Sequence, residues 1–359
     1  MLFFKEKFIF APICIFLFSV FSINLSSQIQ LSDTEIAEIL LDEVALNEHR
    51  FLQNILVYGG ERARDLSTTE EEIFSLLVEF ETTDLTNEEL WEALDYLKLN
   101  LYVPINEYDE IIENISPKSE SLLTYYHPFY SMVYGSVFDL KYYLIRHADL
   151  ILKMIEALEI ADIELYDQYQ GRSALLNSEF MSLIADQNEV GLQMSQKQGI
   201  AYVMSAPTIT ISRITSHAMK LGSLLLLEEL NDATISSTLR EVKELTQILR
   251  NYNKREIIKS IDRLKVSQIA ESPVIMKKID KIEAYAFLCF DSQIRTGEAY
   301  IAMANLFEAP NYEENYYNLI DPINLEIENS MLDESCWQFH SELRETQDLA
   351  INIAQQHKK

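Results

Sequence analysis

Apolar residues recur along most of the chain at the three- and four-residue spacing that places them on one face of an α-helix. The clearest stripe begins at Leu140 and keeps a four-three alternation for more than three heptads, as far as Leu165. It predicts one long helix over about residues 129–169. Similar stripes predict further helices, over about residues 178–204, 208–230, 233–252, 254–267, 272–309 and 322–356. Stripes of this length are typical of helices that pack side by side in antiparallel bundles.

Helix-start signals cluster in the first third of the chain. In a capping box, a Ser or Thr side chain bonds the backbone of the first helical turn, and a Glu three residues later bonds back. Three such pairs occur: Ser32 with Glu35, Ser67 with Glu70, and Thr86 with Glu89. They predict shorter helices, over about residues 33–57, 68–81 and 87–101. Pro104 and Pro117 then interrupt the pattern, because a residue before proline is pushed out of the helical conformation. We predict an N-terminal helical subdomain over 28–116 and a long-helix bundle over 117–359.

One internal segment gives a mixed signal. Residues Thr208 to Ile211 alternate between polar and apolar at period two, which on its own indicates a strand. Pro207 can equally occupy the first turn of a helix. Because the flanking patterns are helical, we expect a helix here.

Glycine and proline are scarce, with eight of each among 359 residues. Folds rich in tight turns need many more of both. The predicted fold is therefore all-α: a long antiparallel helical bundle preceded by a smaller helical subdomain.

The first residues resemble a secretory signal peptide in their general pattern. Lys5 and Lys7 precede an apolar run of 14 residues from Phe8 to Phe21, which suits a signal sequence and is short for a membrane-spanning helix. We expect residues 1–27 to be a signal peptide and the mature chain to be periplasmic or extracellular. The alternative extends the apolar run through Leu25, which would leave an uncleaved anchor and place the chain at a membrane.

Two cysteines remain after residue 27. Cys289 lies in an apolar string and Cys336 lies beside Trp337, so both are expected to be buried free thiols. An exported chain could also join them. A helical hairpin turning near Asn315 would set Cys289 opposite residue 341, about 7.5 Å along the helix from Cys336, which disfavours a bridge.

The chain is strongly acidic, with 57 Asp and Glu against 29 Lys and Arg and a formal charge of −28. This balance excludes nucleic-acid binding as the main function, because phosphate backbones repel it. Residues 28–116 alone carry 22 acids and 4 bases, whereas residues 240–282 carry 11 bases and 6 acids. We expect the basic segment to pack near acidic helices; the alternative is a patch that binds an acidic partner.

Sequence motifs for chemistry are scarce. The chain has no zinc-protease, nucleophile-elbow, phosphate-loop, calcium-loop or paired-cysteine motif, and no His has a Glu three positions before it. Cys336 and His340 share a helix face, but two ligands do not make a metal site. We therefore expect no metal and no cofactor, and we do not expect an enzyme, although acid–base catalysis by unlocated carboxylates stays open.

The best candidate for a binding site is a group of aromatic side chains. Four side chains form a ladder at every fourth position: Tyr130, Tyr134, Phe138 and Tyr142. The preferred interpretation packs this face against the N-terminal subdomain. The alternative is a site for a small apolar or aromatic ligand or for a partner's helix, with His147 nearby on the core stripe. His147 itself is expected to be a hydrogen-bonded core histidine, and the alternative is a ligand contact or general base.

These observations favour an exported, acidic helical bundle that acts without catalysis, as an interaction or envelope-assembly module with a protein partner. The alternative is a sensory-type bundle that binds a ligand through the aromatic ladder.

Overall fold

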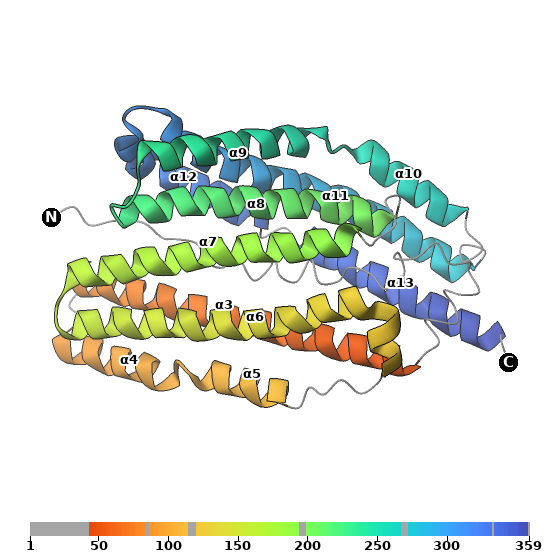
Figure 1. The fold of residues 1–359 in the computed structure, drawn as a ribbon, viewed down its shortest axis with the longest axis horizontal. Coiled ribbons are helices and arrows are strands. Elements are labelled where there is room, and N and C mark those ends of the chain that lie inside the picture. The colour runs from red at the N-terminus through yellow and green to blue at the C-terminus, as the bar shows by residue number, and fades with distance from the viewer. Residues whose placement is uncertain are drawn as a thin grey trace.

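The computed structural model describes residues 43–82, 86–113, 120–193, 199–266, 272–331 and 334–357, and every regular element in these ranges is a helix (Figure 1). The predicted all-α class is confirmed. In chain order the helices are α3 (Glu43–Thr82), α4 (Asn87–Asn100), α5 (Val103–Glu113), α6 (Glu120–Glu159), α7 (Ile163–Gln193), α8 (Ile200–Leu226), α9 (Asp232–Asn251), α10 (Lys254–Lys265), α11 (Pro273–Asn305), the short 3₁₀ helix η2 (Leu306–Glu308), α12 (Tyr312–Met331) and α13 (Ser335–His357).

Most helices lie along the long axis of the molecule (Figure 1). Helices α6, α7 and α8 pack successively against one another, and α11 packs on α8. Helix α3 packs on α6, with α4 and α5 end to end along the outside of this pair. On the other side, α9, α10, α12 and α13 pack against α11. One apolar core extends from α3 to α12, and a second joins α8, α10, α11 and α13.

The stripe from Leu140 continues across two helices, so the prediction of one helix over 129–169 is wrong. Helix α6 ends at Glu159, and the chain turns through Ala161, whose φ is 55°. The amide of Asp162 donates to the carbonyl of Ala157 at 2.9 Å, which closes the end of α6, while the Asp162 carboxylate accepts from the amide of Leu165 in the first turn of α7.

The start signals of the first helices have mixed outcomes. Thr86 and Glu89 form the predicted capping box at the start of α4. Ser67 lies inside α3, however, and its hydroxyl donates to the carbonyl of Ala63 one turn back. The predicted break between residues 57 and 68 is therefore wrong, because the Ser67–Glu70 pair is inside a continuous helix. The Ser32–Glu35 pair and the predicted signal peptide lie outside the described residues.

The segment with the mixed signal is helical, as expected. Residues Thr208 to Ile211 lie inside α8, but Pro207 is within the helix rather than in its first turn. The predicted gap between residues 204 and 208 is absent. The Thr208 hydroxyl donates to the carbonyl of Met204, so the polar residue meets its hydrogen-bonding need within the helix.

Cys289 and Cys336 form a disulfide, with 4.5 Å between their Cα atoms, so the expectation of free thiols is wrong. The predicted helix over 322–356 is two helices, with α12 ending at Met331 and α13 beginning at Ser335. Because the chain turns earlier than expected, between α11 and α12, Cys336 comes level with Cys289 instead of falling about five residues short of it.

The basic segment packs against acidic helices, as expected. Most of its ion pairs reach α11, η2 or α13: Lys243–Glu308, Arg250–Glu298, Lys254–Asp291, Lys265–Glu283, Lys278–Glu342, Lys278–Glu345 and Lys281–Glu342. Within the described residues, no helix has the length and apolar character needed to cross a bilayer.

Candidate functional site

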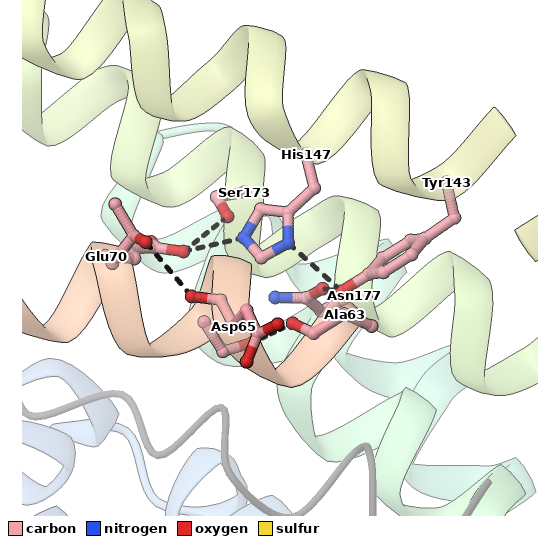
Figure 2. Close-up of polar contacts among 9 residues, drawn as sticks. Ala63, Asp65, Glu70, Tyr143, His147, Ser173 and Asn177 are labelled. Carbon is pink, nitrogen blue, oxygen red and sulfur yellow. Dashed lines mark hydrogen bonds and ion pairs between the residues drawn. The ribbon is translucent and has the colours of Figure 1, made fainter. Parts of the chain in front are cut away.

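His147 lies at the centre of a buried polar network between α3, α6 and α7 (Figure 2). Its side chain has no exposed surface, and its Nε2 lies 2.9 Å from Oε2 of Glu70 on α3. The Ser173 hydroxyl on α7 donates to the same carboxylate oxygen at 3.0 Å. The expectation of a hydrogen-bonded core histidine is confirmed.

The other side of the imidazole faces Tyr143. The Tyr143 hydroxyl lies 3.4 Å from Nδ1 of His147 and donates to Oδ1 of Asn177 on α7. Because the phenol proton points to Asn177, the Tyr143 oxygen is left to accept from Nδ1–H. Both ring nitrogens of His147 therefore face a polar partner, which lowers the cost of burying the imidazole.

The Glu70 carboxylate joins two other side chains of the network. The Ser173 hydroxyl donates to Oε2 of Glu70, the same carboxylate oxygen that lies beside Nε2 of His147. Glu70 Oε1 and Asn177 Nδ2 are buried without a hydrogen-bond partner among the described residues. Burial, and then the charge of Glu70, raise the pKa of the Tyr166 phenol, which therefore stays protonated. His147 and Glu70 are closed to solvent, and the hydrogen bonds of Glu70 join α3 to α6 and α7.

Two rings of the aromatic ladder, Phe138 and Tyr142, are exposed on α6. Phe138 is 41% exposed and Tyr142 is 63% exposed, so the interpretation that packs them against the N-terminal subdomain is wrong for these two positions. The guanidinium of Arg146 covers the ring of Tyr142, 5.5 Å from its centroid. Tyr130 and Tyr134 are part of α6, but their side chains lie outside the described part of the chain.

A second exposed apolar region was not predicted. Four large side chains lie on the outside of α4 and at the start of α5: Trp91 at 36%, Tyr96 at 68%, Leu99 at 80% and Val103 at 46% exposure. We call this region the α4–α5 surface. Leu90 and Leu94 are the buried residues of α4 and form its inward face. Tyr96 and Leu99 are therefore apolar residues that do not pack in the core. They are visible in the sequence as an apolar pair outside the helical stripe.

Acidic side chains border the α4–α5 surface. Glu88, Glu92 and Asp95 are exposed beside it. Lys98 is the only base between residues 87 and 113, and its ammonium lies 2.7 Å from Glu159 at the end of α6. The hydrogen bond to Glu159, with further attraction from nearby acids including Glu156, raises the pKa of Lys98. The one basic side chain of this surface is therefore already in an ion pair with another helix of the same molecule.

The described residues contain no group of three or more His, Cys, Asp or Glu side chains placed to hold a metal ion. Cys336 is bonded to Cys289, so it is not available as a thiolate ligand beside His340.

Comparison of the chain with protein-family models, curated proteins and solved structures finds no significant match. Its function has to follow from its own residues.

Proposed function

We propose that this chain is an exported, non-enzymatic interaction module of an extracellular or envelope assembly, and that it binds another protein through the α4–α5 surface. The observation that carries this proposal is the exposure of Tyr96, Leu99 and Val103 within eight residues of one side of the bundle. Large apolar side chains grouped in this way mark binding surfaces more often than single exposed ones do.

The α4–α5 surface is held in place before any partner arrives. Thr86 caps the first turn of α4. Lys98 joins the end of α4 to Glu159 of α6, and the Tyr102 hydroxyl donates to Asp149 of α6 at 2.7 Å. A partner therefore loses little affinity to ordering the end of this helix, because Lys98 and Tyr102 already hold it against α6.

The non-enzymatic part of the proposal is supported by where the reactive groups lie. His147 and Glu70 are closed to solvent, and their hydrogen bonds join helices. The exposed surface offers apolar and carboxylate groups, which suit binding to a protein.

A photo-crosslinking side chain placed at position 99, in cells that make the protein, tests the proposal. The matched control is position 325, an exposed leucine on α12 that is 57% accessible. We expect discrete crosslinked products from position 99 that disappear when Tyr96 is changed to Ser. Equal crosslinking from both positions, or none from position 99, would contradict an interface here.

A second candidate function is ligand binding by the aromatic ladder. The exposure of Phe138 and Tyr142 on one face of α6 favours it, because flat apolar molecules and helices both stack on such rings. Native mass spectrometry of the purified chain tests it. A small molecule that co-purifies with the chain, and is lost in Tyr142→Ser, would support this candidate; a chain that carries no ligand would oppose it.

A further inference from the structure

Helix α10 is a short amphipathic helix on the outside of the bundle. Ile257 and Ile261 are fully buried against the second core. On the outward side, Ile258 is 43% exposed and Val266, which follows the helix, is 85% exposed. The helix therefore presents apolar side chains to solvent beyond those that its own packing uses.

The outward side of α10 is also basic. Between residues 254 and 266 the chain carries five bases and two acids. Lys254 and Lys265 form ion pairs with Asp291 and Glu283 of α11, so their charges are already paired within the molecule. Arg255, Lys259 and Arg263 are exposed on the outer side. Lys259 forms an ion pair with Glu256, one turn back on the same helix, at 2.6 Å.

The α4–α5 surface is the counterpart of this helix in charge and in length. It presents apolar side chains among Glu88, Glu92 and Asp95, whereas α10 presents apolar side chains among bases. Helix α4 has 14 residues and α10 has 12, which correspond to about 21 Å and about 18 Å at 1.5 Å per residue. We propose that a second copy of this chain docks its α10 onto the α4–α5 surface. This inference goes beyond the proposed function, because it names one occupant of that surface.

The positions of the two helices determine what kind of assembly follows. Helix α4 and helix α10 lie at opposite ends and opposite sides of the molecule (Figure 1). One copy cannot join its own two surfaces. Because the two surfaces lie on opposite sides of the molecule, two copies related by a twofold axis cannot form both contacts at once. The contact is therefore heterologous. An open chain keeps one free α4–α5 surface and one free α10 at its two ends, and a ring forms where these two ends meet.

The contact is expected to be weak. One pair of short helices buries less than the roughly 1,200 Å² at the lower end of stable interfaces. Each copy also carries −28 formal charges, so assembly requires enough salt to screen repulsion between the copies. At 0.15 M salt the screening length is about 8 Å. Ion pairs between side chains in direct contact are shorter than this length and are therefore only partly screened.

Sedimentation velocity of the purified chain at increasing concentration, in about 0.15 M salt, tests this proposal. One variant reverses charge on α4 (Glu92→Lys with Asp95→Lys), and another reverses charge on α10 (Arg255→Glu with Lys259→Glu). Glu313→Lys with Glu326→Lys on α12 is the control, because it changes the net charge as much as the α4 variant does. Urea unfolding verifies that each variant is folded.

We expect the wild-type chain and the α12 control to form species that grow with concentration, and each interface variant alone to stay monomeric. An equimolar mixture of the two interface variants is the decisive sample. In it the reversed α4 charges now face the reversed α10 charges, while the native α4–α5 surface of one variant meets the native α10 of the other, so association returns.

A wild-type chain that stays monomeric up to several hundred micromolar would overturn the proposal, as would growth that neither interface variant reduces. A monomeric wild type that still gives α4-dependent crosslinks to a different protein in cells would reject self-assembly and keep the proposed function. A monomeric wild type without such crosslinks would reject both.

Discussion

His147 illustrates how far a single residue can be interpreted from the sequence. Its place on an apolar stripe predicted a buried histidine, and the structure has it buried. Its partner Glu70 was assigned to a helix start instead, because a Ser three residues before a Glu fits a capping box equally well inside a helix. Only packing of α3 against α6 brings residues 77 positions apart together. Local spacing holds no information on that contact.

Removal of His147 should be costly. His147→Ala leaves the buried Glu70 carboxylate with Ser173 alone, and we expect it to lower the free energy of unfolding by about 3–5 kcal/mol. Ser173→Ala, which removes one hydrogen bond, should cost about 1 kcal/mol. Chemical denaturation measures both. The double variant Glu70→Met/His147→Leu should recover most of the loss, and a double variant as unstable as His147→Ala would show that lost packing, not charge burial, dominates.

His340 should make the fold sensitive to acid. Its Nδ1 is buried without a hydrogen-bond partner among the described residues, and burial lowers the pKa of His340 from 6.5 to about 4. Because the unfolded chain then binds a proton more tightly than the folded one, stability is complete above about pH 6.5 and falls as the pH drops toward 4. The loss should be about 3 kcal/mol. Urea unfolding between pH 4 and pH 7 should show a shallower dependence in His340→Gln; identical slopes would contradict this role.

At the scale of elements, the sequence predicted that the segments are helical, but it did not predict where the helices begin and end. The stripe through Leu140 shows which face is buried, but the chain can reverse direction without losing its periodicity. The reversal at Ala161 uses an alanine with positive φ, where a sequence-based prediction looks for glycine. Pro207 and Pro322 lie inside α8 and α12, where proline is a boundary signal elsewhere. Tertiary packing decided these positions.

Two glycines inside helices should respond oppositely to the same change. A Cβ at Gly59 in α3 would lie 2.6 Å from both the Leu140 and Tyr108 side chains, whereas a Cβ at Gly135 in α6 would have no neighbour within 4 Å. We expect Gly59→Ala to destabilise the fold by about 1–3 kcal/mol through overpacking. Gly135→Ala should stabilise it by about 0.5–1 kcal/mol through helix propensity. Thermal unfolding measures the signs, and a stabilising Gly59→Ala would mean that α3 and α6 are not this close.

At the scale of the whole molecule, composition predicted the class and the distribution of charge predicted one packing relation. The basic segment over 240–282 lies against acidic helices, as its charge suggested. Pairing of Cys289 with Cys336 was not predicted, because it depends on where α12 ends and α13 begins to within a few residues. The α4–α5 surface was also not predicted. An apolar stripe identifies the residues that face the core, and it leaves out exposed apolar residues such as those of this surface.

The disulfide should contribute substantially to overall stability. It closes a segment with a sequence separation of 47 residues, and loss of such a cross-link increases the entropy of the unfolded chain. We expect Cys336→Ser to lower the unfolding free energy by about 2–4 kcal/mol. A reductant should destabilise the wild type and leave this variant unchanged. Equal effects of reductant on both would contradict the bond.

The central claim is that the α4–α5 surface is the part of this bundle that binds. The most direct measurement is the mass of the complexes that contain the chain, after gentle extraction from cells that make it. Three proteins are compared: the wild type, a Tyr96→Ser/Leu99→Ser variant and the control Leu325→Ser. We predict that the wild type and Leu325→Ser migrate as the same large species and that the α4 variant migrates as the free chain, with unchanged stability. Migration of all three at the same mass would contradict the claim.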